Sequence, residues 1–297
     1  MNLIACFQQL ALDVIGEQVR SLTGSESSLQ GFETPLGDRG LFGPDSMAWR
    51  VHAHFTSMMV GGLSSLIVQA LHPRALAAVW DHSDFRRNLK SRLGRTAYFV
   101  AATTYGGRTL AMEAIRRVNT IHAGIQGVDL QGRPYVANES DLVRWVHLVE
   151  VTSFLSAYQH LAREPLTSGE CDQYLAEMTQ TGHLLGATQL PTDLQSTQEA
   201  LLHYREVLTF DERAREILRV VESYPAEGLD KPWMHLVLQA ALDIMPHWAL
   251  NTIERPTACW AEQRLRRCAL QAGSAPIQWT LDVRGVSAVA RKRVNSR

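Results

Sequence analysis

Apolar residues recur three and four positions apart along nearly the whole chain, and sustained alternation of apolar and polar residues is almost absent. Spacing of three and four places side chains on one face of an α-helix, whereas a strand needs a period of two. With 45% hydrophobic residues over 297 positions, such helices can bury a large common core. No low-complexity linker or internal repeat divides the chain. The sequence therefore predicts an all-α fold, with a single multi-helix domain over residues 1–297.

Capping and breaking residues predict where the first helices begin and end. The segment Phe7–Leu22 has the pattern of an amphipathic helix. A loop rich in Gly, Ser and Pro follows and ends at Asp45 or Ser46, either of which is a suitable N-cap. The next helix is expected to continue from there to Leu71, where His72-Pro73 stops it.

Later parts of the chain carry equally clear local signals. The residues Gly127–Asp141 are polar and contain Gly and Pro, so we expect a loop. Thr167 followed by Glu170 is the signature of a capping box at a helix start. After Pro276 the helical periodicity weakens and basic residues accumulate, which predicts a mobile, solvated tail over residues 277–297.

Charge and hydropathy exclude several functional classes. The net charge is −1 and no basic groove interleaved with aromatics is evident, so nucleic acid is not an expected partner. The N-terminus lacks the basic region of a signal peptide, and the most apolar stretch, Met58–Leu71, is too short and polar to span a bilayer. We therefore expect no transmembrane segment and a cytoplasmic location. The oligomeric state is left open.

Sequence motifs for most helical and nucleotide-dependent enzymes are missing. No Glu-x-x-His pair of a di-iron bundle and no HExxH zinc motif occurs. The four cysteines lack zinc-site spacing, and CxxCH, GxSxG, GxGxxG and P-loop motifs are absent as well. A cofactor that brings its own equatorial ligands, and asks the protein for one axial ligand, remains compatible with single histidines.

Two histidines lie on apolar helix faces. His122 shares its face with Ile115, Val118 and Ile125, and His147 shares its face with Val143, Val151 and Phe154. From spacing alone, each is either an axial ligand or a packed core histidine.

A basic helix face precedes them. Arg92, Arg95 and Thr96 stand at positions i, i+3 and i+4 together with Phe99. Such a face can bind carboxylates by charge-assisted hydrogen bonds or polarise bound dioxygen, but a solvated basic face or a phosphate contact has the same pattern.

Five segments in one order resemble a known family. The segments are QALHPRALAAVWDHSDF (Gln69–Phe85), RLGRTAYFVAATTYG (Arg92–Gly106), RVNTIHAGIQG (Arg117–Gly127), YVANESDLVRWVHLVE (Tyr135–Glu150) and LTSGECDQYLAEMTQTGHLLG (Leu166–Gly186). They are similar to the haem-dependent oxygenases that include the latex-clearing rubber oxygenases and the MpaB-type oxygenases. The similarity covers about residues 45–250 and implies a helical core with a globin-like arrangement.

The resemblance also implies roles for individual residues. His122 matches the proximal ligand of the haem iron, and Arg92 and Thr96 match residues that line the distal side. Arg95 stands where the family has Lys, and because a guanidinium stays protonated, it is expected to orient a propionate or bound oxygen. His147 is the second candidate ligand. For the family's distal acid, the matching region offers the following positions: Asp81, Asp84, His72 and His82.

The function implied by this resemblance is oxygenase chemistry. Haem b would be the cofactor, and dioxygen and an apolar, alkene-bearing or isoprenoid molecule would be the substrates. A haem carrier or sensor without turnover, and a cofactor-free helical binding protein, remain the alternatives.

Overall fold

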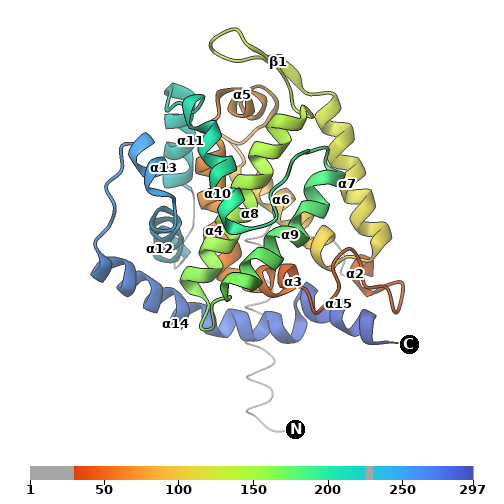
Figure 1. Ribbon diagram of the computed structural model, residues 1–297. Coiled ribbons are helices and arrows are strands. Elements are labelled where there is room, and N and C mark those ends of the chain that lie inside the picture. Colours follow the sequence, from red (N-terminus) through yellow and green to blue (C-terminus); the bar gives the residue numbers. More distant parts are fainter. Residues whose placement is uncertain (1–29, 225–229, 297) are drawn as a thin grey trace.

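The computed structural model describes residues 30–224 and 230–296, and within them the fold is almost entirely helical (Figure 1). The elements in chain order are α2 (Gln30–Glu33), α3 (Met47–His52), α4 (Phe55–Gln69), α5 (Pro73–His82), α6 (Leu89–Tyr105), α7 (Arg108–Ala123), β1 (Gln126–Val128), β2 (Pro134–Val136), α8 (Ser140–Leu161), α9 (Ser168–Leu184), α10 (Leu194–His203), the 3-10 helix η1 (Tyr204–Glu206), α11 (Glu212–Glu222), α12 (Asp230–Asp243), α13 (His247–Thr252), α14 (Trp260–Arg284) and α15 (Val286–Asn295). The prediction of an all-α protein is confirmed. The predicted helix Phe7–Leu22 lies outside the described residues.

Helices α4 and α8 form the centre of the molecule and pack closely along their lengths (Figure 1). The close approach depends on Gly61 of α4, because a Cβ atom there would lie 2.9 Å from the Cα of Phe154. Trp145 and Leu148 of α8 are fully buried in the main core. Helix α12 covers α4, while α9 packs against α3 and α8. Burial on nearly all sides explains why α8 is apolar around much of its circumference.

The helix expected between Ser46 and Leu71 is divided in two. Ser46 caps α3 by accepting a hydrogen bond from the backbone N–H of Trp49, at 3.2 Å, so this N-cap is confirmed. The chain breaks at Ala53, and the ring of His54 then caps α4 by accepting from the N–H of Ser57 at 3.2 Å. The periodicity continues across the break, which is why the sequence alone did not reveal it.

The predicted loop Gly127–Asp141 contains a short β-hairpin. Strands β1 and β2 pair antiparallel, with Gly127 opposite Tyr135. Tyr135 is buried under α5, and its hydroxyl donates to Asp81 at 2.9 Å. The expectation of an irregular loop is therefore wrong, because tertiary contacts order a segment with weak local propensity.

The C-terminal segment also differs from its expectation. Helix α14 continues through Pro276, and α15 follows after Gly285. Arg293 is 1% exposed and donates to the backbone carbonyls of Phe32 and Asp38, at 2.9 and 3.0 Å. A solvated tail over residues 277–296 is thus wrong, because these helices dock on the body of the protein. The capping box of Thr167 and Glu170 at the start of α9 is confirmed.

Among the described residues, no single helix has both the length and the hydrophobicity to cross a membrane. Helices α4 and α5 meet that test only together, as a pair bent by 105°.

Candidate active site

Helices α6 and α7 bring the sequence-predicted site residues to one end of a helical pair. The helices pack against each other and are joined by the short turn Gly106-Gly107, so they run antiparallel. Arg92 lies in the first turn of α6 and His122 lies in the last turn of α7. Residues that are 30 positions apart in sequence therefore reach the same end of the pair.

Arg92 is a partly buried cation without a carboxylate partner. Its guanidinium donates to the hydroxyl of Ser83 at 3.1 Å. Burial, and secondarily the charge of Arg95, lower the pKa of Arg92 to about 10. None of the ion pairs between described residues includes Arg92. A desolvated charge without a counterion is unfavourable, so this position favours an anionic ligand.

Arg95 and Thr96 lie next to Arg92 on α6 but are more open to solvent. Arg95 donates to the hydroxyl of Ser91 at 2.8 Å, and the hydroxyl of Thr96 donates to the backbone carbonyl of Arg92 at 3.3 Å. Both contacts are local to the helix and leave the remaining donors of Arg95 available. The structure keeps the three predicted residues together on one stretch of α6.

His122 is half-buried near the end of α7, and burial lowers its pKa. The imidazole is therefore neutral at neutral pH, which is the form that binds iron. No hydrogen bond between described residues involves its ring. One turn earlier, Asn119 donates to the carbonyl of Leu184 at 3.0 Å, which ties this face of α7 to the end of α9.

His147 has a different environment. It is buried in α8, and desolvation, with a smaller contribution from the charge of His183, lowers its pKa to about 4. Its ring lies directly against Gly182 of α9, where a Cβ atom would be 2.9 Å from Nε2. The absence of a side chain at Gly182 thus makes room for the imidazole. This packing favours a structural position for His147 between two helices over an axial ligand.

Glu150 is the residue that the sequence analysis missed. It lies on α8 one turn after His147, and burial raises its pKa to about 7. The carboxyl has no ion-pair partner among the described residues, yet part of its surface stays accessible. Desolvation without a neighbouring cation favours the neutral form of a carboxyl group. The one signal available from sequence was a lone acid within the apolar run of α8.

A hydrogen-bonded network lies near Glu150. His52 of α3 is fully surrounded by protein, and burial lowers its pKa to about 3. Its Nδ1 lies 2.7 Å from the hydroxyl of Thr104 in α6, and its Nε2 lies 3.0 Å from the hydroxyl of Tyr174 in α9. The charge of Glu150 helps raise the pKa of Tyr174. The four helices α3, α6, α8 and α9 therefore enclose a polar interior.

Five buried polar atoms on α3, α6, α8 and α9 have no hydrogen-bond partner among the described residues. Two of them are the hydroxyl oxygens of Tyr105 on α6 and Thr181 on α9. Buried polar groups are normally paired, so unpaired ones mark either stored strain or a missing ligand.

The four candidates for a distal acid or base all have local structural contacts. Asp81 also lies 3.8 Å from the guanidinium of Arg213. The main contacts are Asp81 with Tyr135 at 2.9 Å, Asp84 with Arg87 at 2.8 Å, His72 with the N–H of Ala75 at 3.4 Å, and His82 with the carbonyl of Gln126 at 3.2 Å. Each therefore has a role in the fold of α5 or its neighbours.

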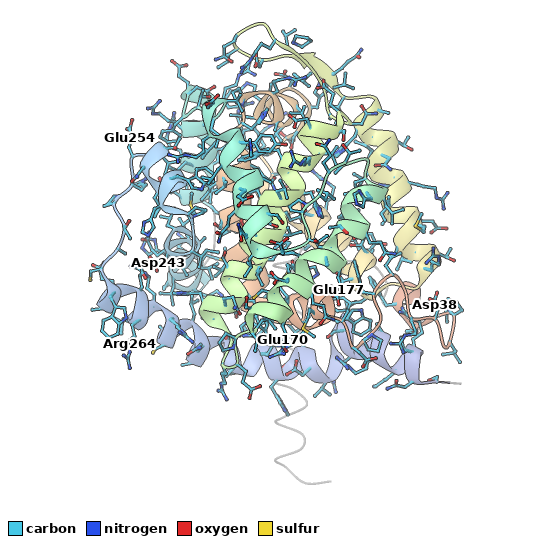
Figure 2. The ribbon with its side chains drawn as sticks, viewed as in Figure 1. Asp38, Glu170, Glu177, Asp243, Glu254 and Arg264 are labelled. Carbon is cyan, nitrogen blue, oxygen red and sulfur yellow. The ribbon has the colours of Figure 1, made fainter. Side chains whose placement is uncertain are left out.

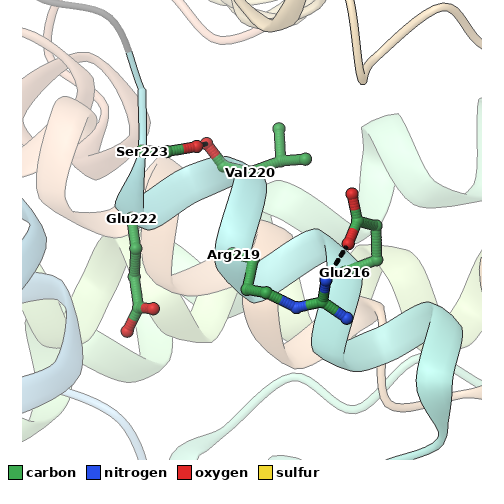
Figure 3. Close-up of a pocket in the computed structure, with 5 residues that line it drawn as sticks. All are labelled: Glu216, Arg219, Val220, Glu222 and Ser223. Atoms are coloured by element: carbon green, nitrogen blue, oxygen red, sulfur yellow. Dashed lines mark hydrogen bonds and ion pairs between the residues drawn. The ribbon is translucent and has the colours of Figure 1, made fainter.

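Surface hollows on α11 do not coincide with this site. One is lined by Glu216, Arg219 and their neighbours on the same helix, and these two residues pair with each other at 2.7 Å (Figure 3). A second hollow beside it reaches Trp80 and Arg86, whose guanidinium stacks 3.6 Å above the indole. Neither is lined by a sequence-predicted site residue. Within residues 30–224 and 230–296, no group of three or more His, Cys, Asp or Glu could hold a metal ion.

An all-α protein with a neutral imidazole and an unpaired guanidinium at one end of a helical pair, and an unpaired buried carboxyl on a central helix, fits the class of helical oxygenases. The family comparison agrees: the chain belongs to the family described as "ER-bound oxygenase mpaB/B'/Rubber oxygenase, catalytic domain", whose model matches residues 49–279. The match includes the helices α4 to α9, and the family predicted from the sequence is confirmed. Comparisons with curated proteins and with solved structures gave no match.

Proposed function

We propose that this protein is a haem b-dependent oxygenase that acts with dioxygen on an apolar, alkene-bearing molecule in the cytoplasm. The observation that carries the proposal is the juxtaposition of an unpaired, partly buried guanidinium, Arg92, with a neutral imidazole, His122, at one end of α6 and α7. Haem b requires one axial ligand and cations for its propionates, and these residues fit both needs. When bound, haem supplies an iron centre that activates dioxygen for transfer to an organic molecule.

His122 would hold the iron, because its imidazole is neutral and forms no hydrogen bond with the described residues. Arg92 would hold a propionate, since a carboxylate there would relieve the cost of its desolvated charge. Arg95 and Thr96 would orient the ligand from the solvent side of α6. His147 would support the site by fixing the packing of α8 on α9.

Glu150 would supply the exchangeable proton of the interior. With a pKa of about 7, its carboxyl is present in both protonation states near neutral pH, as a general acid or base requires. The apolar residues of α8 around it would exclude water and favour an apolar substrate.

The test is an absorption spectrum with a pyridine haemochrome assay on the wild type, His122→Ala and His147→Ala. We expect a Soret band in the wild type, loss of that band in His122→Ala, and its retention in folded His147→Ala. A colourless wild type that cannot be reconstituted with haem would refute the proposal. If the band is present, oxygen consumption with squalene and other alkenes would separate an oxygenase from a haem carrier.

A further inference from the structure

Several polar side chains of α14 make contacts toward the inside of the molecule. Arg266 forms a bidentate ion pair with Asp243 of α12, and both N–O distances are 2.7 Å. Asp243, labelled in Figure 2, is 3% exposed in its side chain, and this low exposure shields the pair largely from solvent. Two glutamines make further inward contacts: Gln271 donates to the carbonyl of Leu161 at 2.8 Å, and Gln278 donates to the carbonyl of Ala53 at 3.0 Å.

The outward face of α14 is apolar along almost its whole length. Leu265, Trp279 and Val283 have 72%, 50% and 47% of their surfaces exposed. We call this face the apolar band, and its exposed residues are Ala261, Leu265, Cys268, Ala269, Ala272, Ala275, Pro276, Trp279 and Val283. They repeat at helical spacing on the side opposite the buried Leu270 and Ser274.

An ordinary surface helix turns its apolar side inward, whereas α14 has apolar residues on its buried side, at Leu270, and on its exposed side as well. The band spans roughly 33 Å at the rise of an α-helix. Contiguous exposed apolar surface of this kind marks an interaction site. In Figure 1, α14 lies along the lower edge of the molecule, and the exposure of its band residues places the band on the outer side of this helix.

The charges at the margins of the band argue against an anionic lipid surface. The exposed charged residues are Glu262 and Arg264 at one end and Asp282 and Arg284 at the other, which balance. In Figure 2, Arg264 lies near the beginning of α14. Helices that bind membrane surfaces are usually rich in exposed cations on their polar side, and the exposed charges of α14 show no such excess.

The chain itself contains a segment that matches the band. Residues 1–29 precede the described part of the chain, and Leu3, Phe7, Leu10 and Val14 repeat there at helical spacing. The described chain starts at α2, which packs against α15, the helix that follows α14 after Gly285. Residues 23–29 can span roughly 23 Å when extended, which gives the preceding residues a reach of that length from α2. A tethered partner also acts at a high effective concentration.

We propose that the N-terminal segment, residues 1–29, docks along the apolar band of α14 with Phe7, Leu10 and Val14 against it. The interaction would cover the apolar band and remove its side chains from solvent. It is independent of haem binding and of the proposed oxygenase activity.

Native cysteines provide a test on the full-length chain. Cys268 lies in the band, while Cys259 is exposed at the start of α14. Maleimide labelling rates are measured by peptide mass spectrometry and divided by the rates in the denatured chain. We expect Cys268 to be protected at least about tenfold relative to Cys259, which corresponds to an opening free energy of about 1.4 kcal/mol.

Variants identify what protects Cys268. The triple substitution Phe7→Asp, Leu10→Asp and Val14→Asp should abolish the protection, while Gln9→Asp on the opposite side of the segment should preserve it. A bismaleimide should also join Cys6 to Cys268 within a monomer of the unsubstituted protein.

Three outcomes would overturn the proposal. Equal labelling of Cys268 and Cys259 would show that the band is open. Protection that disappears on dilution would assign the band to a second copy of the chain. Protection that requires phosphatidylcholine vesicles would assign it to a lipid surface.

Discussion

His52 of α3 and His122 of α7 lie near opposite ends of α6, and they differ in the number of hydrogen bonds that their rings form. His52 contacts Thr104 near the end of α6 and Tyr174 of α9, and both its ring nitrogens are used. His122 lies by the beginning of α6, where the described residues leave its ring without a hydrogen bond and Arg92 without a carboxylate. Buried polar groups that are fully paired stabilise a fold, whereas unpaired ones keep their bonding capacity for a ligand. The comparison assigns a structural role to His52 and leaves His122 and Arg92 available for a ligand.

Replacing each histidine by alanine gives the largest expected difference. His52→Ala removes a buried ring and leaves Thr104 and Tyr174 unpaired, so we expect a loss of about 3 kcal/mol in the free energy of unfolding. His122→Ala should change it by less than about 1 kcal/mol in haem-free protein, because its ring is only half-buried. Urea denaturation of both variants measures the difference. Equal losses of unfolding free energy in the two variants would contradict the difference proposed between His52 and His122.

The pH dependence of stability tests the environment of Glu150. Burial raises its folded-state pKa to about 7, above the ordinary value of 4.5. Its favourable contribution is therefore complete below pH 4.5 and is lost as the pH rises through 7. The loss should be about 2 kcal/mol after allowance for partial exposure.

Denaturation of Glu150→Gln at pH 5 and pH 8 checks this value. In Glu150→Gln, the free energy of unfolding should lack this decrease between pH 5 and pH 8. Glu113→Gln, at an exposed position of α7, should show the same decrease as the wild type. The same decrease in Glu150→Gln would place the carboxyl of Glu150 in contact with solvent.

Arg92 and Arg95 provide a matched pair for haem binding. Arg92→Gln should weaken haem affinity about tenfold, since a charge-assisted hydrogen bond of about 1.4 kcal/mol is lost. Arg95→Gln should have a smaller effect, because Arg95 is exposed and its charge is screened by solvent. Titration of haem into the apoprotein measures both affinities. A larger effect of Arg95 would reverse the assignment.

The smallest expected effect concerns a single hydrogen bond of the paired end. Thr104→Val keeps the shape of the side chain but leaves Nδ1 of His52 without its partner, which should cost about 1 kcal/mol. Thr120→Val on the surface of α7 removes only a local bond to the carbonyl of Arg116 and should be nearly neutral. Thermal unfolding compares the two. A neutral Thr104→Val would mean that the network contributes little to stability.

Local sequence signals predicted most helices and the cluster on α6. The capping residues Ser46 and Thr167 begin helices as expected, because capping depends on a few neighbouring residues. Periodicity also placed Arg92, Arg95 and Thr96 on one helix, since residues three and four apart share a face. The break at Ala53 and the hairpin of β1 and β2 were missed, because both depend on contacts with distant residues.

The sequence by itself determined the all-α class, the family and the chemical groups available for a site. These follow from periodicity and from motifs, which are properties of short segments. Only the tertiary structure decided which of these polar groups have hydrogen-bond or ion-pair partners. Gly182 accommodates His147, Tyr135 binds Asp81, and Glu150 is left unpaired in the interior, because pairing and desolvation depend on which helices meet. The same holds for α14, whose periodicity indicated a helix but whose exposed apolar side was fixed by the contacts of its other side with the body of the protein.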